Sequence, residues 1–103
     1  MKPGHSVSLL QGREKVCYLT GRTDALHKHH VFGGPRRAVS DKHGFWVWLT
    51  AEWHNAAPYS VHRGGWEIRR RIQAECQKAY LEAHTMDEWM QLIGKDYIGE
   101  EKT

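Results

Sequence analysis

Two adjacent histidines, His29 and His30, end a short run of apolar and polar residues and stand directly before an apolar pair and a Gly-Gly turn. Imidazole side chains both ligate transition metals and exchange protons near neutral pH. Two more histidines, His54 and His62, follow downstream. A metal-dependent nuclease centre needs such a set, with one ring on the metal and its neighbour to activate water.

The doublet is expected to lie on a β-strand, where neighbouring side chains point to opposite faces. His29 and His30 therefore cannot easily share one role, and one ring can face a metal while the other faces substrate or water. His27 shares a face with His29, so these two form a rival pair of ligands. A single histidine is more often structural. Three within residues 27–30, with two more downstream, favour a functional site.

Spacing alone does not bring the downstream pair together. His54 and His62 are eight residues apart, and Pro58 interrupts the segment between them. The two rings meet only if the chain turns back around residues 56–59. A functional role is favoured for His54, while a ligand role and a loop-surface role remain equally open for His62.

Length and composition favour one small α+β domain with a polyanionic partner. The chain has 103 residues, five tryptophans to supply much of a core, and a formal net charge of +3. The two distant cysteines, Cys17 and Cys76, indicate a reducing, cytoplasmic setting rather than a disulfide scaffold. No apolar stretch predicts a membrane span or a signal peptide, and no motif indicates a small-molecule cofactor or an oligomeric state.

Strand-forming composition occurs in three segments, residues 16–19, 25–32 and 45–49. The first two are expected to pair as an antiparallel hairpin. Residues 33–44 are rich in glycine and charge and are expected to form a loop. Thr50 is expected to cap a short helical turn.

The flanking segments differ sharply from one another. Residues 1–14 are polar and are expected to be a flexible N-terminal segment before a single domain at residues 15–103. After Gly64-Gly65, apolar residues at helical spacing predict a helix over residues 66–84. Thr85 and Glu88 form a capping-box pattern for another helix that ends near Gly94.

Four stretches of this chain together resemble the HNH endonuclease family, and more narrowly small HNH-type proteins of bacteriophage genomes. They are CYLTG at residues 17–21, LHKHHVFGG at 26–34, WLTAEWHN at 48–55 and VH at 61–62. The resemblance covers residues 15–63, and the C-terminal helices at 66–93 also resemble those small phage proteins. It implies a ββα-metal core of hairpin, loop and helix, plus two C-terminal helices. It also implies a location in the host cytoplasm if the chain is phage-encoded.

The resemblance also implies roles for individual histidines. His30 corresponds to the general base, while His29 and His54 correspond to metal ligands. His62 is the candidate for the third ligand. The cofactor implied is one divalent metal ion, with Zn, Ni or Mn favoured by imidazole ligands and Mg usable if phosphate oxygens and waters complete its shell.

This chain departs from the family pattern at the middle motif residue. The family places an asparagine several residues before the last histidine, where it often helps to hold the loop and orient the base. Here residues 45–47 are Phe, Trp and Val. Asn55, next to His54, is the nearby asparagine and is the candidate for this catalytic role.

A second departure concerns the cysteines. Many relatives hold a structural zinc with two cysteine pairs, whereas this chain has Cys17 with Thr20, then Thr50 with Trp53. One thiolate cannot build a four-ligand structural zinc site, so none is expected.

Basic residues complete the expected site. Arg36, Arg37 and Arg63 are candidates for contacts to DNA phosphates, which carry affinity rather than sequence preference. The leading expectation is an HNH-type endonuclease that hydrolyses phosphodiester bonds in DNA with a histidine base and one histidine-bound divalent metal. The alternative is a catalytically weak or inactive HNH-fold protein that binds nucleic acid or assists recombination. A purely structural metal-binding module is a third, less favoured option.

Overall fold

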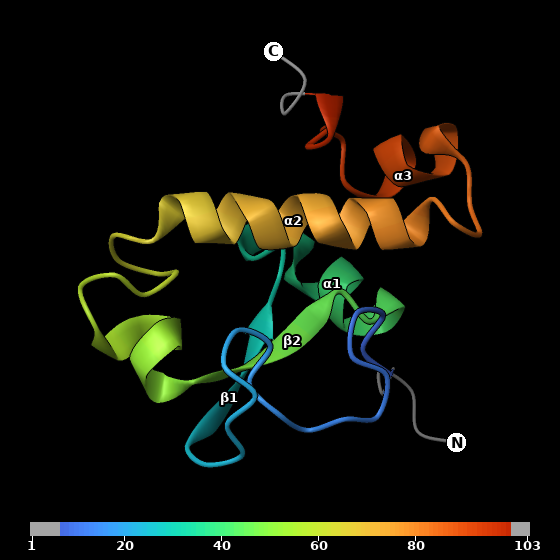
Figure 1. Cartoon of the computed structure of the whole chain (residues 1–103). Helices are drawn as coiled ribbons and strands as arrows, with labels where there is room; N and C mark the ends of the chain where they lie inside the picture. Colours follow the sequence, from blue (N-terminus) through green and yellow to red (C-terminus); the bar gives the residue numbers. More distant parts are fainter. Residues whose placement is uncertain (1–6, 100–103) are drawn as a thin grey trace.

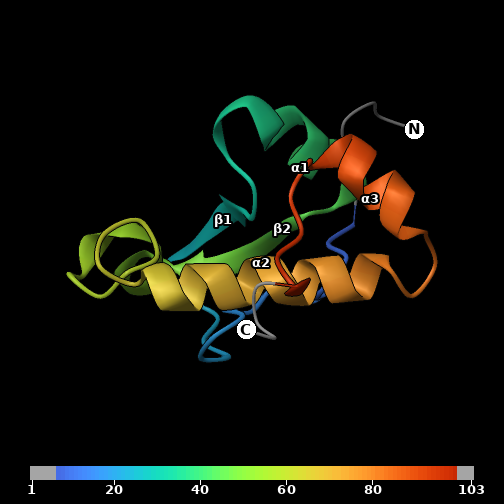
Figure 2. The ribbon, with the colours of Figure 1, turned by 90° about the horizontal axis from the view of Figure 1, so that it is seen from above.

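The computed structural model describes residues 7–99, which form a small α+β fold, as expected from the sequence. Its sheet is an antiparallel pair, β1 (Leu26–His30) and β2 (Trp46–Thr50). The long helix α2 (Trp66–Tyr80) runs across this pair, with α3 (Met86–Leu92) near its end (Figures 1 and 2). Shorter elements connect these parts: η1 (Gly34–Arg36), α1 (Arg37–His43) and the π-helical turn η2 (Glu52–Ala56).

Two of the three predicted strands form, within residues 25–32 and 45–50, but the first does not, and the predicted pairing is wrong. β1 pairs with β2, with His29 opposite Val47 and His30 opposite Trp46. Residues 16–19, the expected partner of β1, form turns instead. Their backbone closes on itself, because Cys17 N donates to the Arg22 carbonyl at 2.7 Å.

The segment between the strands contains a helix where a loop was predicted. Helix α1 is capped by Gly44, whose left-handed backbone (φ 76°) stops the helix and whose lack of a Cβ lets the Val7 carbonyl approach closely. The Ser40 hydroxyl donates to the Phe32 carbonyl at 2.7 Å and accepts from the Phe32 N–H at 3.2 Å. These bonds fix α1 beside the end of β1.

The core lies between the hairpin and the C-terminal helices. Apolar side chains of β2 and of the preceding residue Phe45 pack there with side chains of α2 and α3. Fully buried residues of this group are Phe45, Val47, Leu49, Ile72, Cys76 and Trp89. Trp66 is 65% exposed, so tryptophan contributes less to the core than its abundance predicts. The buried face of β1 and β2 therefore carries the apolar packing, and His29 lies on that face.

The C-terminal helices match the prediction except at the end of α2. This helix ends at Tyr80 rather than at residue 84. Thr85 has an extended backbone as the N-cap of α3, so the chain must leave the helical conformation before it. The predicted capping box is confirmed: Thr85 Oγ1 accepts from Glu88 N at 3.1 Å, and Thr85 N donates to Glu88 Oε1 at 2.8 Å. Within residues 7–99, none of the helices has the length and apolar character needed to cross a membrane.

Part of the segment expected to be flexible is anchored to β2. The buried Ser8 hydroxyl donates to the Trp46 carbonyl at 2.6 Å, and Gln11 Oε1 accepts from Trp48 N at 2.8 Å. Leu9 N also donates to the Gly44 carbonyl. The Ser8 and Gln11 bonds satisfy backbone groups on the outer edge of β2, beside which no further strand lies among residues 7–99. Residues 1–6 of that predicted segment lie outside the described residues.

Candidate metal centre and its pocket

Three of the predicted site histidines come together from three different parts of the chain. His29 lies on β1, His54 on η2, and His62 in the turns before α2. One ring nitrogen from each lies within 4.8 Å of the others, close enough to hold a single metal ion. The ring centroids are 5.5 Å apart for His29 and His54, 5.1 Å for His29 and His62, and 4.7 Å for His54 and His62.

Backbone pairing explains how His62 reaches His54 across eight residues. Val61 N donates to the Trp53 carbonyl at 2.9 Å, and His62 N donates to the His54 carbonyl at 3.2 Å. The Trp53 ring packs on Tyr59 at 4.7 Å, which closes the turn between them. The chain therefore does turn back around residues 56–59, the condition under which the two rings meet.

The glycine pair that follows makes this turn fit. A Cβ on Gly64 would lie 2.5 Å from the Pro58 carbonyl oxygen, and one on Gly65 would lie 2.3 Å from that of Tyr59. Both glycine N–H groups donate back into the turn. Only glycine allows this close approach, so the pair holds His62 in place as well as marking the start of α2.

His29 has the buried, neutral environment of a metal ligand. The side chain is 2% exposed, and neither ring nitrogen has a hydrogen-bond partner among residues 7–99. Burial, and then the neighbouring His62 and His54, lower the pKa of His29 to about 3. The ring is therefore neutral near pH 7, which is the form that binds metals. Leaving such a buried polar group unpaired costs about 1–3 kcal/mol, and a metal ion at the cluster would remove this penalty.

His54 is also neutral near pH 7, and a contact with His27 helps to position its ring. Burial, followed by His62 and His27, lowers the pKa of His54 to about 4. His54 Nδ1 lies 3.1 Å from His27 Nδ1, so its Nε2 remains for the cluster. His27, the rival ligand from the sequence, is exposed and contacts the cluster through His54.

His30 borders the same pocket as the two downstream histidines, although it lies on the opposite face of β1 from His29. A pocket of about 290 Å³ is lined by Lys28, His30, Gly33, Gly34, Arg37, His54 and His62. A neighbouring one of about 490 Å³ is lined by Lys28, His30, Arg37, Ala38 and Asp41. As the last residue of β1, His30 lies where the strand gives way to the Gly-Gly turn, and so it reaches the space in front of the cluster.

The three predicted phosphate contacts have different surroundings. Arg37 lines both pockets. Arg36 Nε donates to the Ile93 carbonyl at 3.1 Å and so ties η1 to the end of α3. The Arg63 guanidinium donates to the Ala56 carbonyl at 2.9 Å and supports the turn that carries His62. Arg37 is therefore the arginine best placed for a ligand in the pocket.

Two charged residues at the pocket were not predicted. Lys28 lies two residues before His30, so strand alternation alone places it on the same face. Asp41 belongs to α1, which the sequence did not predict, and no local pattern pointed to it. Asn55 is exposed on η2 and lies outside the residues that line the two pockets.

The two cysteines are separate from the histidine cluster. Burial raises the pKa of the Cys17 thiol, but hydrogen bonds from the Thr20 side chain and the Thr50 backbone outweigh this and leave it lowered. Cys17, Thr20 and Thr50 thus meet in space. Cys76 is buried in the core, and burial raises its pKa.

The chain matches no family model, no curated protein and no solved structure.

Proposed function

We propose that this chain is a metal-dependent HNH-type endonuclease that hydrolyses phosphodiester bonds in DNA, with β1, β2 and η2 as its ββα-metal core. The observation that carries the proposal is the cluster of His29, His54 and His62 beside a fourth histidine, His30, at one pocket. A structural metal site has four protein ligands, whereas a catalytic one has three and keeps a position open. Three ligands and a pocket fit the catalytic kind.

The ligand set suits a divalent transition metal. Imidazole nitrogens favour zinc, nickel or manganese, while magnesium prefers oxygen. Bound at His29, His54 and His62, such an ion would supply Lewis-acid stabilisation of the charge that develops on phosphate oxygens. All three rings have lowered pKa values, with burial as the first cause in each, so protons compete weakly for this site near neutral pH.

His30 fits the general base. Its side chain is 18% exposed, and burial lowers its pKa, while a hydrogen bond with Asp41 opposes this shift. The ring is therefore neutral near pH 7 and can accept a proton. Because Nε2 faces the Asp41 carboxylate, Nδ1 is the nitrogen that takes a proton from water.

The rim of the pocket suits a phosphate backbone. Lys28 and Arg37 supply positive charge beside His30. Gly33 and Gly34 add backbone without side chains, and a Cβ placed on either would meet no atom within 4 Å. A strand of DNA can therefore approach the backbone here closely, with contacts that do not depend on base sequence.

A plasmid-nicking assay tests the proposal. Wild type is incubated with supercoiled plasmid and manganese, nickel, zinc or magnesium, beside His30→Ala and the matched control His84→Ala. His84 lies between α2 and α3, outside the residues that line the two pockets. We expect nicking by wild type and His84→Ala, and loss of nicking with retained metal binding in His30→Ala. Absence of wild-type cleavage in all four metals would refute the nuclease proposal.

One observation favours a second candidate, a non-cleaving protein that binds nucleic acid or assists recombination. Residues 45–47 hold no asparagine, and Asn55 lies outside the pocket. Metal and DNA binding without cleavage in the same assay would support this candidate. Loss of DNA binding as well would leave a metal-binding module.

A further inference from the structure

We propose that Asp41 is the positioning residue that fixes the orientation and tautomer of His30, and that Lys28 holds Asp41 in place for this task. The catalytic consequence rests on the proposed nuclease function, whereas the structural relationship does not. The pairing supplies an orienting partner for the base in a chain whose motif lacks the asparagine.

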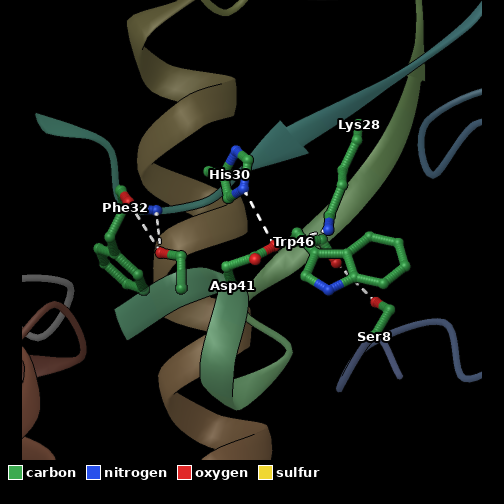
Figure 3. Close-up of polar contacts among 7 residues, drawn as sticks. Ser8, Lys28, His30, Phe32, Asp41 and Trp46 are labelled. Carbon is green, nitrogen blue, oxygen red and sulfur yellow. Dashed lines mark hydrogen bonds and ion pairs between the residues drawn. The ribbon is translucent and has the colours of Figure 1, made fainter. Parts of the chain in front are cut away.

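A single carboxylate oxygen joins the two basic side chains. Asp41 Oδ1 accepts from Lys28 Nζ at 2.6 Å and faces His30 Nε2 at 3.4 Å (Figure 3). All three side chains are partly enclosed, with 35% of Lys28, 38% of Asp41 and 18% of His30 exposed. The contact to His30 is long for a hydrogen bond, so its effect is to orient the ring rather than to bind it tightly.

Lys28 is itself fixed from a second side. Its ammonium lies 4.5 Å from the centre of the Trp46 ring. Trp46 stands opposite His30 in the strand register, and its carbonyl accepts from the buried Ser8 hydroxyl (Figure 3). The ammonium is thus held between an aromatic ring and a carboxylate, which restricts where that carboxylate can go.

Asp41 also sits on a rigid support. The preceding residue, Ser40, is fully buried, and its hydroxyl bonds both backbone groups of Phe32. The Ser40 carbonyl accepts from Phe45 N at 2.8 Å. Helix α1 is therefore tied to the chain just after β1 and just before β2. A group on such an element holds its position better than one on a loop.

The charge state of Asp41 determines which ring nitrogen of His30 carries the proton. The hydrogen bond from Lys28 holds the pKa of Asp41 below its usual range, so the carboxylate is ionised and only accepts. A neutral imidazole facing it keeps its proton on Nε2 and its lone pair on Nδ1. A carboxylate that fixes the tautomer in this way makes a histidine a more effective base without itself becoming protonated.

The first test reads the tautomer directly and needs no cleavage. Long-range ¹H–¹⁵N spectra of the imidazole rings are recorded at pH 7.5 for the zinc-loaded full chain, with His30 assigned by its loss in His30→Gln. We expect a protonated Nε2 and an unprotonated Nδ1 in wild type, and a tautomer mixture in Asp41→Ala. Asp24→Ala removes an exposed carboxylate bound to Arg22 and is the matched control, expected to leave the His30 signals unchanged.

The second test measures the consequence for the reaction. In Asp41→Ala we expect kcat for plasmid nicking to fall about 100-fold or more with KM and zinc affinity unchanged, and Asp41→Glu to recover part of the loss. An unchanged His30 spectrum in Asp41→Ala, or a wild-type ring protonated on Nδ1, would overturn the proposal. A wild type that shows the expected tautomer and cleaves nothing would refute the nuclease function and leave the Asp41–His30 relationship standing.

Discussion

The Nδ1 atoms of His27 and His54 lie 3.1 Å apart, so one imidazole donates a hydrogen bond to the other between β1 and η2. Two neutral rings can share this bond only if one carries its proton on Nδ1 and the other does not. A His54 that donates from Nδ1 has its lone pair on Nε2, toward the cluster. His27 then acts on a metal through His54, as outer hydrogen-bond partners commonly do for histidine ligands.

Replacing His27 should weaken the metal site without abolishing it. We expect His27→Ala to raise the zinc dissociation constant about 10- to 100-fold, the usual effect of losing an outer-shell partner. Competition titration against a chromophoric chelator measures this. His54→Ala, which removes a ligand itself, serves as the reference for near-complete loss. Equal losses in the two variants would show that His27 binds the ion directly.

Replacing His29 should separate stability from metal binding. The ring is buried with two unpartnered nitrogens, so His29→Leu should raise the free energy of unfolding of the metal-free chain, by about 1–3 kcal/mol. The same variant should lose the zinc-dependent stabilisation of wild type. Urea unfolding in EDTA and then in zinc measures both effects. A destabilised metal-free variant would contradict the interpretation that the buried His29 ring lowers the free energy of unfolding when no metal is bound.

The metal-free chain should lose stability in mild acid through His29. Burial lowers its folded-state pKa from 6.5 to about 3, so the unfolded chain binds a proton between these values and the folded chain does not. The contribution of this pKa difference to the free energy of unfolding is fully present above pH 6.5. It falls with decreasing pH by up to about 1.4 kcal/mol per pH unit. Urea unfolding at pH 7 and pH 5 in EDTA should therefore show a smaller drop for His29→Leu than for wild type. Equal drops would exclude His29 as the source.

Two arginines of equal charge should differ in their effect on DNA. Arg37 lines the pocket, whereas Arg63 is bonded to a carbonyl of the η2 turn. We expect Arg37→Ala to weaken DNA binding and to lower the slope of log affinity against log salt by about 1, the value for one phosphate contact. Arg63→Ala should leave that slope unchanged. Fluorescence anisotropy with a labelled duplex over a salt series distinguishes the two, and equal slopes in both variants would disprove the assignment.

The sequence predicted the features that depend on neighbouring residues. Alternation on a strand separates His29 from His30, and the structure encloses the first and leaves the second at a pocket rim. The capping box at Thr85 and the α+β class likewise follow from local pattern. These features need only the geometry of one element and the chemistry of its residues.

What the sequence did not predict depends on contacts between distant segments. Residues 16–19 have the composition of a strand, yet they close on themselves and β1 pairs across a longer connection. Helix α1 has no apolar stripe to reveal it, and so Asp41 was missed. His62 remained open because its place is set by backbone bonds between two turns and by a glycine pair beneath them.

The register of β1 against β2 has a consequence for two chemically identical side chains. A shift of one residue would exchange the faces of β1, enclosing His30 and exposing His29. Val31, two residues after His29 and on the same face, is fully buried and opposes such a shift because it would turn outward together with His29. Hydrophobic packing thus makes the two imidazoles non-interchangeable. A mutation that slips β1 by one residue would exchange the environments of the two histidines while leaving the amino-acid identity of both positions intact.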